Sequence, residues 1–183
     1  MKKNGVEHVQ GTGGLAAHGN VTIDNGRTLS ASNTIIATGA SPRALDALPV
    51  DGRIVIGSRE ALELREVPKR VVIVGGGAIG VEFAYLWRSY GSEVTIVELL
   101  PRLVPVEDEE ISSQLERSFK KQGISVMTGS QVKNIEVGDG NAEVTIFTGI
   151  DEKIIECDKV LVGIGAQGNI DGIGLESMGV AVE

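Results

Sequence analysis

The stretch that decides the fold is Val71-Val72-Ile73-Val74-Gly75-Gly76-Gly77-Ala78-Ile79-Gly80-Val81-Glu82-Phe83-Ala84. Four β-favouring apolar residues lead into a glycine-rich turn, and a helical pattern follows. Gly75, Gly77 and Gly80 fit the spacing G-x-G-x-x-G, which is weakly informative by itself in a chain with 25 glycines. Because a buried strand precedes the turn and a helix follows it, the stretch predicts a dinucleotide-binding loop.

Each glycine has its own expected task in such a loop. Gly75 permits the tight turn out of the strand, Gly77 lets a pyrophosphate approach the backbone, and Gly80 lets the helix pack closely on the sheet. The helix start adds unpaired N–H groups and the positive end of the helix dipole, and both favour phosphate groups.

Glu98 stands at the end of the following strand, 18 residues beyond Gly80. A carboxylate there is expected to accept hydrogen bonds from the adenosine ribose hydroxyls and to repel the 2′-phosphate of NADP. The site is therefore predicted to prefer NAD, although Arg102 follows within a few residues. The alternative interpretation of Glu98 is an exposed acid at a strand end.

The overall composition argues against several classes of protein. The formal net charge of −8 disfavours nucleic-acid and anionic-membrane partners, which require a basic surface. No apolar run approaches the roughly 20 residues of a transmembrane helix. The single cysteine, Cys157, excludes an intrachain disulfide and fits a cytoplasmic location. The two chain ends suggest a piece of a longer protein.

The order of the elements predicts an α/β fold. In chain order, the elements expected after residue 70 are strand 71–74, helix 78–90, strand 94–97, helix 108–122, and strands 124–127, 131–137, 142–147, 153–157 and 160–164. The first five alternate as β-α-β-α-β, which implies right-handed crossovers and a Rossmann-like parallel sheet. The next three are short and alternate between apolar and polar residues, which predicts an antiparallel β-meander.

Apolar stripes predict which helix faces point to the core. The side chains expected there are Phe83, Leu86, Trp87 and Tyr90 on the first helix and Ile111, Leu115 and Phe119 on the second.

Residues 1–57 are expected to form a separate β-rich domain, followed by a second domain over residues 58–183. Partial alternation at 6–11 predicts a strand, and Asn25-Gly26 predicts a hairpin. Residues 33–40 predict an apolar strand that ends at Thr38-Gly39. Such an end allows close approach to a ligand, but these residues alone favour an ordinary exit from a strand into a loop.

Outside the glycine loop, no pattern typical of a catalytic or metal site is found. Glu82 lies near the start of the helix, where the dipole alone stabilises an acid. Cys157 is expected to be a structural or half-exposed thiol rather than a nucleophile. We therefore expect no catalytic and no metal-ligating residue in this chain.

Several segments closely resemble the flavin-dependent disulfide reductases, most of all the dihydrolipoamide dehydrogenases. They are residues 72–84, 93–98, 35–40, 120–124 and 160–165. The resemblance extends over nearly the whole chain. It implies an intact homodimeric enzyme that oxidises dihydrolipoyl groups through a redox disulfide and FAD, and passes hydride to NAD. The implied partner is the dihydrolipoyl domain of a 2-oxo-acid dehydrogenase complex.

The resemblance also implies which residues contact the cofactors. Residues 1–57 would be part of an FAD domain, in which the matching positions are Gly13, Thr38, Gly39 and Ala40. Residues 58–183 would be the NAD domain, in which the matching positions are Gly75, Gly76, Gly77, Ala78, Ile79, Gly80, Glu82, Glu98, Val132 and Gly165. In that family Glu82 also lies near the flavin.

The sequence departs from the family pattern in several places. It lacks the pair of redox cysteines, the first flavin glycine motif and the C-terminal dimerisation domain with its His–Glu base, so this chain alone is expected to be inactive and to hold FAD poorly. Gly165-Ala166 stands where many members have Gly-Arg. Three alternatives stay open: a piece of an NADH oxidase or peroxidase of the same superfamily, a non-catalytic NAD-binding module, and a Rossmann domain whose ligand site is vestigial.

Overall fold

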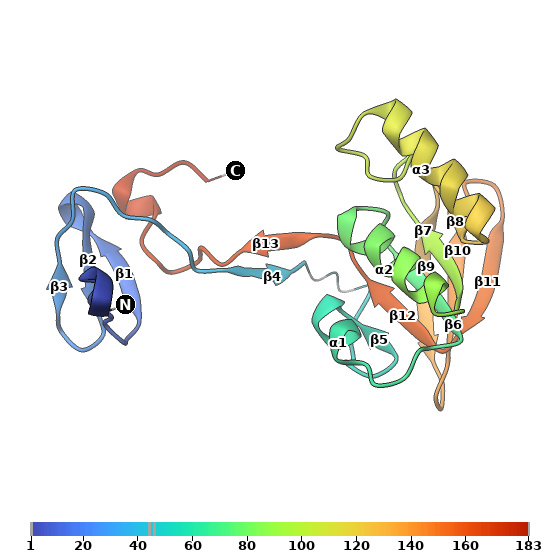
Figure 1. Ribbon diagram of the computed structural model, residues 1–183, viewed down its shortest axis with the longest axis horizontal. Coiled ribbons are helices and arrows are strands. Elements are labelled where there is room, and N and C mark those ends of the chain that lie inside the picture. Colours follow the sequence, from blue (N-terminus) through green and yellow to red (C-terminus); the bar gives the residue numbers. More distant parts are fainter. Residues whose placement is uncertain (1, 44, 46, 183) are drawn as a thin grey trace. The chain divides into compact units, whose positions relative to one another are not determined.

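Figure 1 shows the computed structural model, which describes residues 2–43, 45 and 47–182. The chain forms two compact units, of which one is Pro42–Gln167 and the other combines Met1–Ser41 with Gly168–Glu183. The described residues between 42 and 57 therefore fold with the parallel sheet. The division of cofactor-binding roles between residues 1–57 and 58–183 stays a prediction.

The larger unit is built on a five-stranded parallel sheet with the order β5-β12-β6-β7-β8. Its strands are β5 (Val55–Ile56), β6 (Arg70–Val74), β7 (Glu93–Val97), β8 (Ser125–Met127) and β12 (Lys159–Val162). Its helices are α1 (Ser58–Glu63), α2 (Ala78–Ser89) and α3 (Glu109–Gln122). All four strand pairings are parallel, and Ile73 lies opposite both Ile96 and Leu161. The predicted α/β class is confirmed.

Both faces of the parallel sheet are covered. Val72 and Val74 of β6 pack on the side of the meander, whereas Val71 and Ile73 pack with the aromatic residues of α2 and α3. Val72 and Ile73 are 0% exposed. A strand buried on both faces reads as a continuous apolar run, which explains the sequence before the glycine loop.

The predicted antiparallel meander is also confirmed. Its strands are β9 (Gln131–Val137), β10 (Ala142–Phe147) and β11 (Glu152–Cys157), with β10 in the middle. Ala142, Val144 and Ile146 of β10 are buried, so alternate residues of this strand face the parallel sheet.

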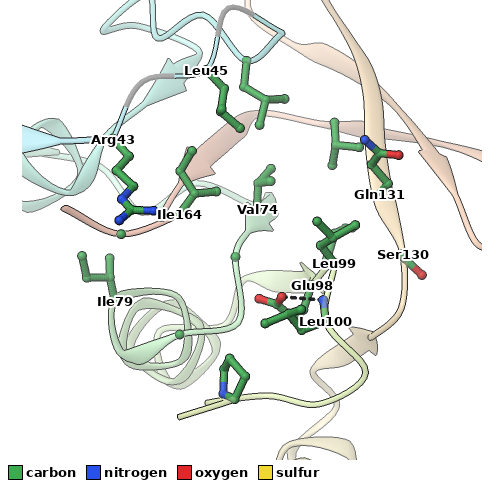
Figure 2. Close-up of a pocket in the computed structure, with 18 of the residues that line it drawn as sticks. Arg43, Leu45, Val74, Ile79, Glu98, Leu99, Leu100, Ser130, Gln131 and Ile164 are labelled. Carbon is green, nitrogen blue, oxygen red and sulfur yellow. Dashed lines mark hydrogen bonds between the residues drawn. The ribbon is translucent and has the colours of Figure 1, made fainter. Parts of the chain in front are cut away.

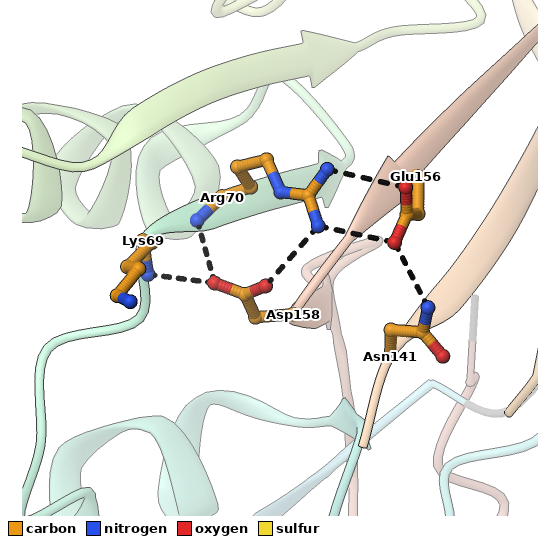
Figure 3. Close-up of polar contacts among 5 residues, drawn as sticks. All are labelled: Lys69, Arg70, Asn141, Glu156 and Asp158. Carbon is orange, nitrogen blue, oxygen red and sulfur yellow. Dashed lines mark hydrogen bonds and ion pairs between the residues drawn. The ribbon is translucent and has the colours of Figure 1, made fainter. Parts of the chain in front are cut away.

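A cluster of polar side chains links the meander to the parallel sheet (Figure 3). The guanidinium of Arg70, at the start of β6, donates two hydrogen bonds to Glu156 of β11, at 3.1 and 3.3 Å. Asp158 accepts the backbone N–H groups of Lys69 and Arg70, at 2.8 and 2.9 Å. The hydrogen bond from Arg70, with a further one from Asn141, holds the pKa of Glu156 below its ordinary value. This cluster lies at the amino end of β6, away from the glycine loop at its carboxyl end.

The buried helix faces differ from the predicted stripes. In α2 the buried residues are Gly80, Phe83, Ala84 and Trp87. Leu86 and Tyr90 are instead 40% and 67% exposed, because the small residues Gly80 and Ala84 allow the neighbouring face of α2 to approach the sheet. In α3, Ile111 is 53% exposed and Ser112 is buried. Within the described part of the chain, no helix has the length and apolar character to cross a bilayer.

The smaller unit contains a three-stranded antiparallel sheet with the order β1-β2-β3. Its elements are η1 (Lys2–Asn4), β1 (Gly13–Ala16), η2 (Ala17–Gly19), β2 (Asn20–Ile23), β3 (Thr28–Leu29) and η3 (Glu176–Met178). The hairpin predicted at Asn25-Gly26 joins β2 to β3, and Gly26 takes a φ of +83° there. The first strand begins at Gly13, so the strand predicted at 6–11 is wrong.

The apolar strand predicted at 33–40 is also wrong. Only its last residue enters a strand, β4 (Ala40–Pro42), which pairs with β13 (Ala166–Gly168). Ile35 is 92% exposed. An apolar segment forms a strand only where a neighbour accepts and donates its backbone hydrogen bonds, and no described strand lies beside residues 33–39.

Candidate functional site

A pocket of about 810 Å³ opens at the carboxyl ends of the central parallel strands (Figure 2). Its lining includes the last residues of β6 and β7, Val74 and Val97, and Gly163 directly after β12. In open parallel sheets, ligands bind at this edge. The pocket therefore coincides with the place that the glycine loop predicted.

Gly75 and Gly80 are required by close backbone packing. Gly75 has a φ of +110°, and a Cβ atom there would collide with the carbonyl oxygen of Gly163. A Cβ atom at Gly80 would collide with the carbonyl oxygen of Gly75 and lie 3.3 Å from Ile73 Cγ2. The first turn of α2 therefore packs directly on the loop that precedes it and on β6.

Gly77 differs from its neighbours because its missing side chain leaves open space. A Cβ atom there would meet no heavy atom within 4 Å, and Gly77 lines the pocket. Gly77 is also the N-cap of α2, without a side-chain capping hydrogen bond. Ala78 and Ile79 follow it on the pocket wall. The N–H groups of this first turn have no acceptor within the helix, so they are available to an anionic ligand.

Glu98 connects two segments of the pocket. Its side chain, 8% exposed, accepts the N–H of Gly76 on Oε2 at 2.5 Å and the N–H of Leu100 on Oε1 at 2.7 Å. Gly76 in turn packs against Leu103, whose Cδ2 atom would lie 2.7 Å from an added Cβ. The interpretation of Glu98 as an exposed acid is therefore wrong. Each carboxylate oxygen has a second lone pair, which leaves room for ribose hydroxyl donors.

The remaining residues predicted for NAD fall into two groups. Val132, 8% exposed at the start of β9, and Gly165, with a φ of +105°, both line the pocket. Glu82 is exposed on α2 and does not line it. The structure thus brings Val132 and Gly165 to the glycine loop and leaves Glu82 on the surface.

The residues predicted for FAD lie in the smaller unit. Gly13 begins β1, and an added Cβ there would lie 3.5 Å from Val21. Thr38 and Gly39 lie on the extended segment before β4, where their carbonyl groups accept hydrogen bonds from Asn169 at 3.3 and 2.9 Å. Ala40 is the first residue of β4.

Sequence reasoning missed several parts of the pocket wall, and three of them lie next to β4, β7 and β9. Arg43 lines it directly after β4, Leu99 and Leu100 line it after Glu98, and Ser130 and Gln131 line it at the start of β9. Leu99 and Leu100 could have been found from their position after the predicted ribose-binding residue. Arg43 carries no such signal.

Arg102 does not contribute a charge to the pocket. Its guanidinium donates to the carbonyl of Pro105 at 3.0 Å and lies 4.0 Å from Glu109. Arg102 therefore contacts the loop after β7 and the start of α3.

The ionisable groups on and near the described pocket wall are few. The charged side chains on the described pocket wall are Arg43 and Glu98. Cys157 is 1% exposed in the core between the two sheets, and burial raises the pKa of its thiol to about 11. A thiol protonated at neutral pH and shielded from solvent is not a nucleophile. The described residues also hold no cluster of His, Cys, Asp or Glu suited to a metal ion.

Comparisons with known proteins agree with this fold. A dihydrolipoyl dehydrogenase of Chlorobaculum tepidum is 44% identical over 190 residues, which cover 100% of this chain and 40% of the relative. The crystal structure of LpdA from Mycobacterium tuberculosis superposes with a TM-score of 0.80 at 28% identity and covers 100% of this chain and 41% of that one. The HOCl-induced flavoprotein disulfide reductase RclA of Escherichia coli gives a TM-score of 0.75 at 25% identity, over 96% of this chain and 40% of that one.

The family model with the description "Pyridine nucleotide-disulphide oxidoreductase" matches residues 1–183. The chain spans about 40% of the length of the curated relatives it matches. Because the match covers every residue and the fold agrees with that of solved relatives, the chain is a member of the pyridine nucleotide-disulphide oxidoreductase family.

Proposed function

We propose that residues 58–183 form an NAD-binding domain whose ligand occupies the pocket at the carboxyl ends of β6, β7 and β12. This proposal rests on a difference in the space around the loop glycines. Added side chains at Gly75 and Gly80 would strike backbone, whereas Gly77 faces open space on the pocket wall. A backbone surface kept bare beside a helix N-terminus fits a pyrophosphate. The pocket volume, about 810 Å³, suits a large ligand.

The proposed ligand is NAD rather than NADP. Glu98 presents a carboxylate at the end of β7, where the adenosine ribose would bind, and a 2′-phosphate there would meet its negative charge. Arg102, the nearest cation along the chain, is held by Pro105 and Glu109. The protein's part is to bind and orient the cofactor, which supplies the hydride-transfer chemistry.

For the intact protein, we propose the activity of a dihydrolipoyl dehydrogenase. Its support is the identity to the curated dihydrolipoyl dehydrogenases, which is 44% for the Chlorobaculum tepidum relative and 38% for the Mycobacterium bovis relative. In this proposal residues 1–57 supply part of an FAD site, with contacts from Gly13, Thr38, Gly39 and Ala40. The intact protein would act as a cytoplasmic homodimer on dihydrolipoyl domains of a 2-oxo-acid dehydrogenase complex.

Calorimetric titration of the chain with NADH and NADPH tests the binding proposal. We expect NADH to bind and NADPH to bind at least tenfold more weakly. Gly77→Ala should weaken NADH binding, because the added methyl occupies the surface proposed for the pyrophosphate. Gly168→Ala is the matched control, since its methyl would lie at an ordinary 3.6 Å from Ile170 and outside the pocket. No NADH binding by the unchanged chain at millimolar concentration would refute the proposal.

A further inference from the structure

Arg43 is the one cationic side chain on the described wall of the pocket. It follows β4 and reaches the pocket from a different segment than the glycine loop. Its backbone N–H donates to the carbonyl of Gly165 at 3.0 Å. Its Cδ atom lies 3.9 Å from the position that a Cβ would take at Gly165. The backbone of Arg43 is therefore held beside Gly165, just after the carboxyl end of β12.

Arg43, Ile79 and Ile164 all line the pocket, and Figure 2 shows the guanidinium of Arg43 well separated from Glu98. Ile79 lines the pocket beside Gly163, since its Cγ2 atom lies 3.5 Å from the position of a Cβ at Gly163. The carboxylate of Glu98 lies instead beside Leu100, whose N–H it accepts. The pocket thus has an acidic end after β7 and a basic end after β12, with the first turn of α2 between them.

These two ends suit different groups of a dinucleotide, because a carboxylate accepts hydrogen bonds from ribose hydroxyls and a cation attracts phosphate. If the adenosine ribose binds at the acidic end and the pyrophosphate binds at the start of α2, the nicotinamide half of the dinucleotide extends toward β12. We propose that Arg43 binds the phosphate on the nicotinamide side of the pyrophosphate, an inference that rests on the proposed NAD-binding function. A guanidinium suits this task because its planar fork of N–H groups matches two phosphate oxygens.

The sequence after β12 also supports this role for Arg43. Gly165 is followed by Ala166 and Gln167, so the strand end itself supplies no cation. Arg43 places a guanidinium at that strand end through its backbone hydrogen bond to Gly165. The helix N-terminus provides N–H donors and a partial charge. Arg43 adds a full positive charge, which the proposal assigns to the phosphate on the nicotinamide side.

The test compares Arg43→Gln with Arg65→Gln, which removes an exposed arginine outside the pocket. NADH, adenosine 5′-monophosphate and inorganic phosphate are titrated calorimetrically into each protein. We expect Arg43→Gln to weaken NADH binding about tenfold, the lower range for a hydrogen bond to a charged group. Adenosine monophosphate should bind unchanged, and the salt dependence of NADH binding should become shallower. Arg43→Lys should restore part of the affinity, because it keeps the charge without the fork.

The outcomes separate this inference from the proposal on which it rests. If the unchanged chain binds no NADH, the NAD-binding function itself is refuted. If NADH binds equally to the unchanged chain and to Arg43→Gln, only the role of Arg43 is refuted. An equal loss for NADH and adenosine monophosphate would also refute it, by placing Arg43 at the adenosine end. Weakened binding of inorganic phosphate alone would show a general anion site and contradict the dinucleotide role.

Discussion

Replacing Glu98 with alanine removes the acceptor of two backbone N–H groups, those of Gly76 and Leu100. Gly76 is buried, so its N–H would be left without any partner, whereas Leu100 is 47% exposed and its N–H can turn to water. A buried donor without a partner costs about 1–3 kcal/mol, and the exchange of a charged acceptor for water costs less. We therefore expect Glu98→Ala to lower the free energy of unfolding by about 3 kcal/mol.

Urea unfolding followed by tryptophan fluorescence measures this loss. The chain has one tryptophan, and Trp87 is 4% exposed in the core between α2 and the parallel sheet. With a denaturant slope of about 2 kcal/mol per molar urea, the expected loss lowers the midpoint by about 1.5 M. Glu98→Gln should show a smaller loss, because its amide keeps one acceptor oxygen for one of the two donors.

Glu93→Ala is the matched control, because Glu93 is the exposed first residue of the same strand. Its midpoint should stay close to that of the unchanged protein. If Glu98→Ala also unfolds at the unchanged midpoint, the carboxylate does not hold the glycine loop, and the reasoning from its hydrogen bonds is refuted. If both variants lose stability equally, the effect belongs to β7 in general.

Three further predictions follow from the same geometry. Gly80→Ala should lower the free energy of unfolding by about 3 kcal/mol, the upper range for an overpacked site, because the added methyl strikes the carbonyl of Gly75; the urea midpoint measures it. Cys157 should react with a thiol reagent at pH 8 only after unfolding. Burial raises the pKa of the Cys157 thiol from 9.0 to about 11. The part of the unfolding free energy that depends on the protonated thiol is therefore complete below pH 9 and is lost as the pH rises through 11, which urea titrations across that range would detect. The chain alone should not reduce NAD with dihydrolipoamide, since its single cysteine cannot form an intrachain redox disulfide; measurable turnover would contradict this.

The sequence was sufficient to predict the parallel sheet, the meander and the loop between β6 and α2. These elements have strong local signals: an apolar run, glycines at fixed spacing and alternating strands. The predicted strand at 33–40 had the same kind of apolar signal and was wrong. Strand formation depends on a neighbouring strand, and Ile35, 92% exposed, has none among the described residues.

The limits of sequence reasoning at the pocket also have a physical cause. Glu98 was placed correctly at a strand end, but its hydrogen bond with the N–H of Gly76, 22 residues earlier in the chain, forms only in the folded structure. Arg43 was not found because tertiary contacts bring it to the pocket, namely the pairing of β4 with β13 and the hydrogen bond to Gly165. Its chain neighbours, Pro42 among them, indicate a connecting segment and give no hint of a ligand.

The pairing of β4 with β13 has a consequence for how the larger unit can be handled. The chain enters this unit at Pro42 and leaves it at Gln167, and these residues lie in two strands that hydrogen-bond to each other. The first and last residues of the unit therefore lie close together, and joining them with a peptide would cost little chain entropy. Residues 42–167 can be excised as a module, inserted into a loop of another protein, or circularly permuted with a short peptide across the former ends.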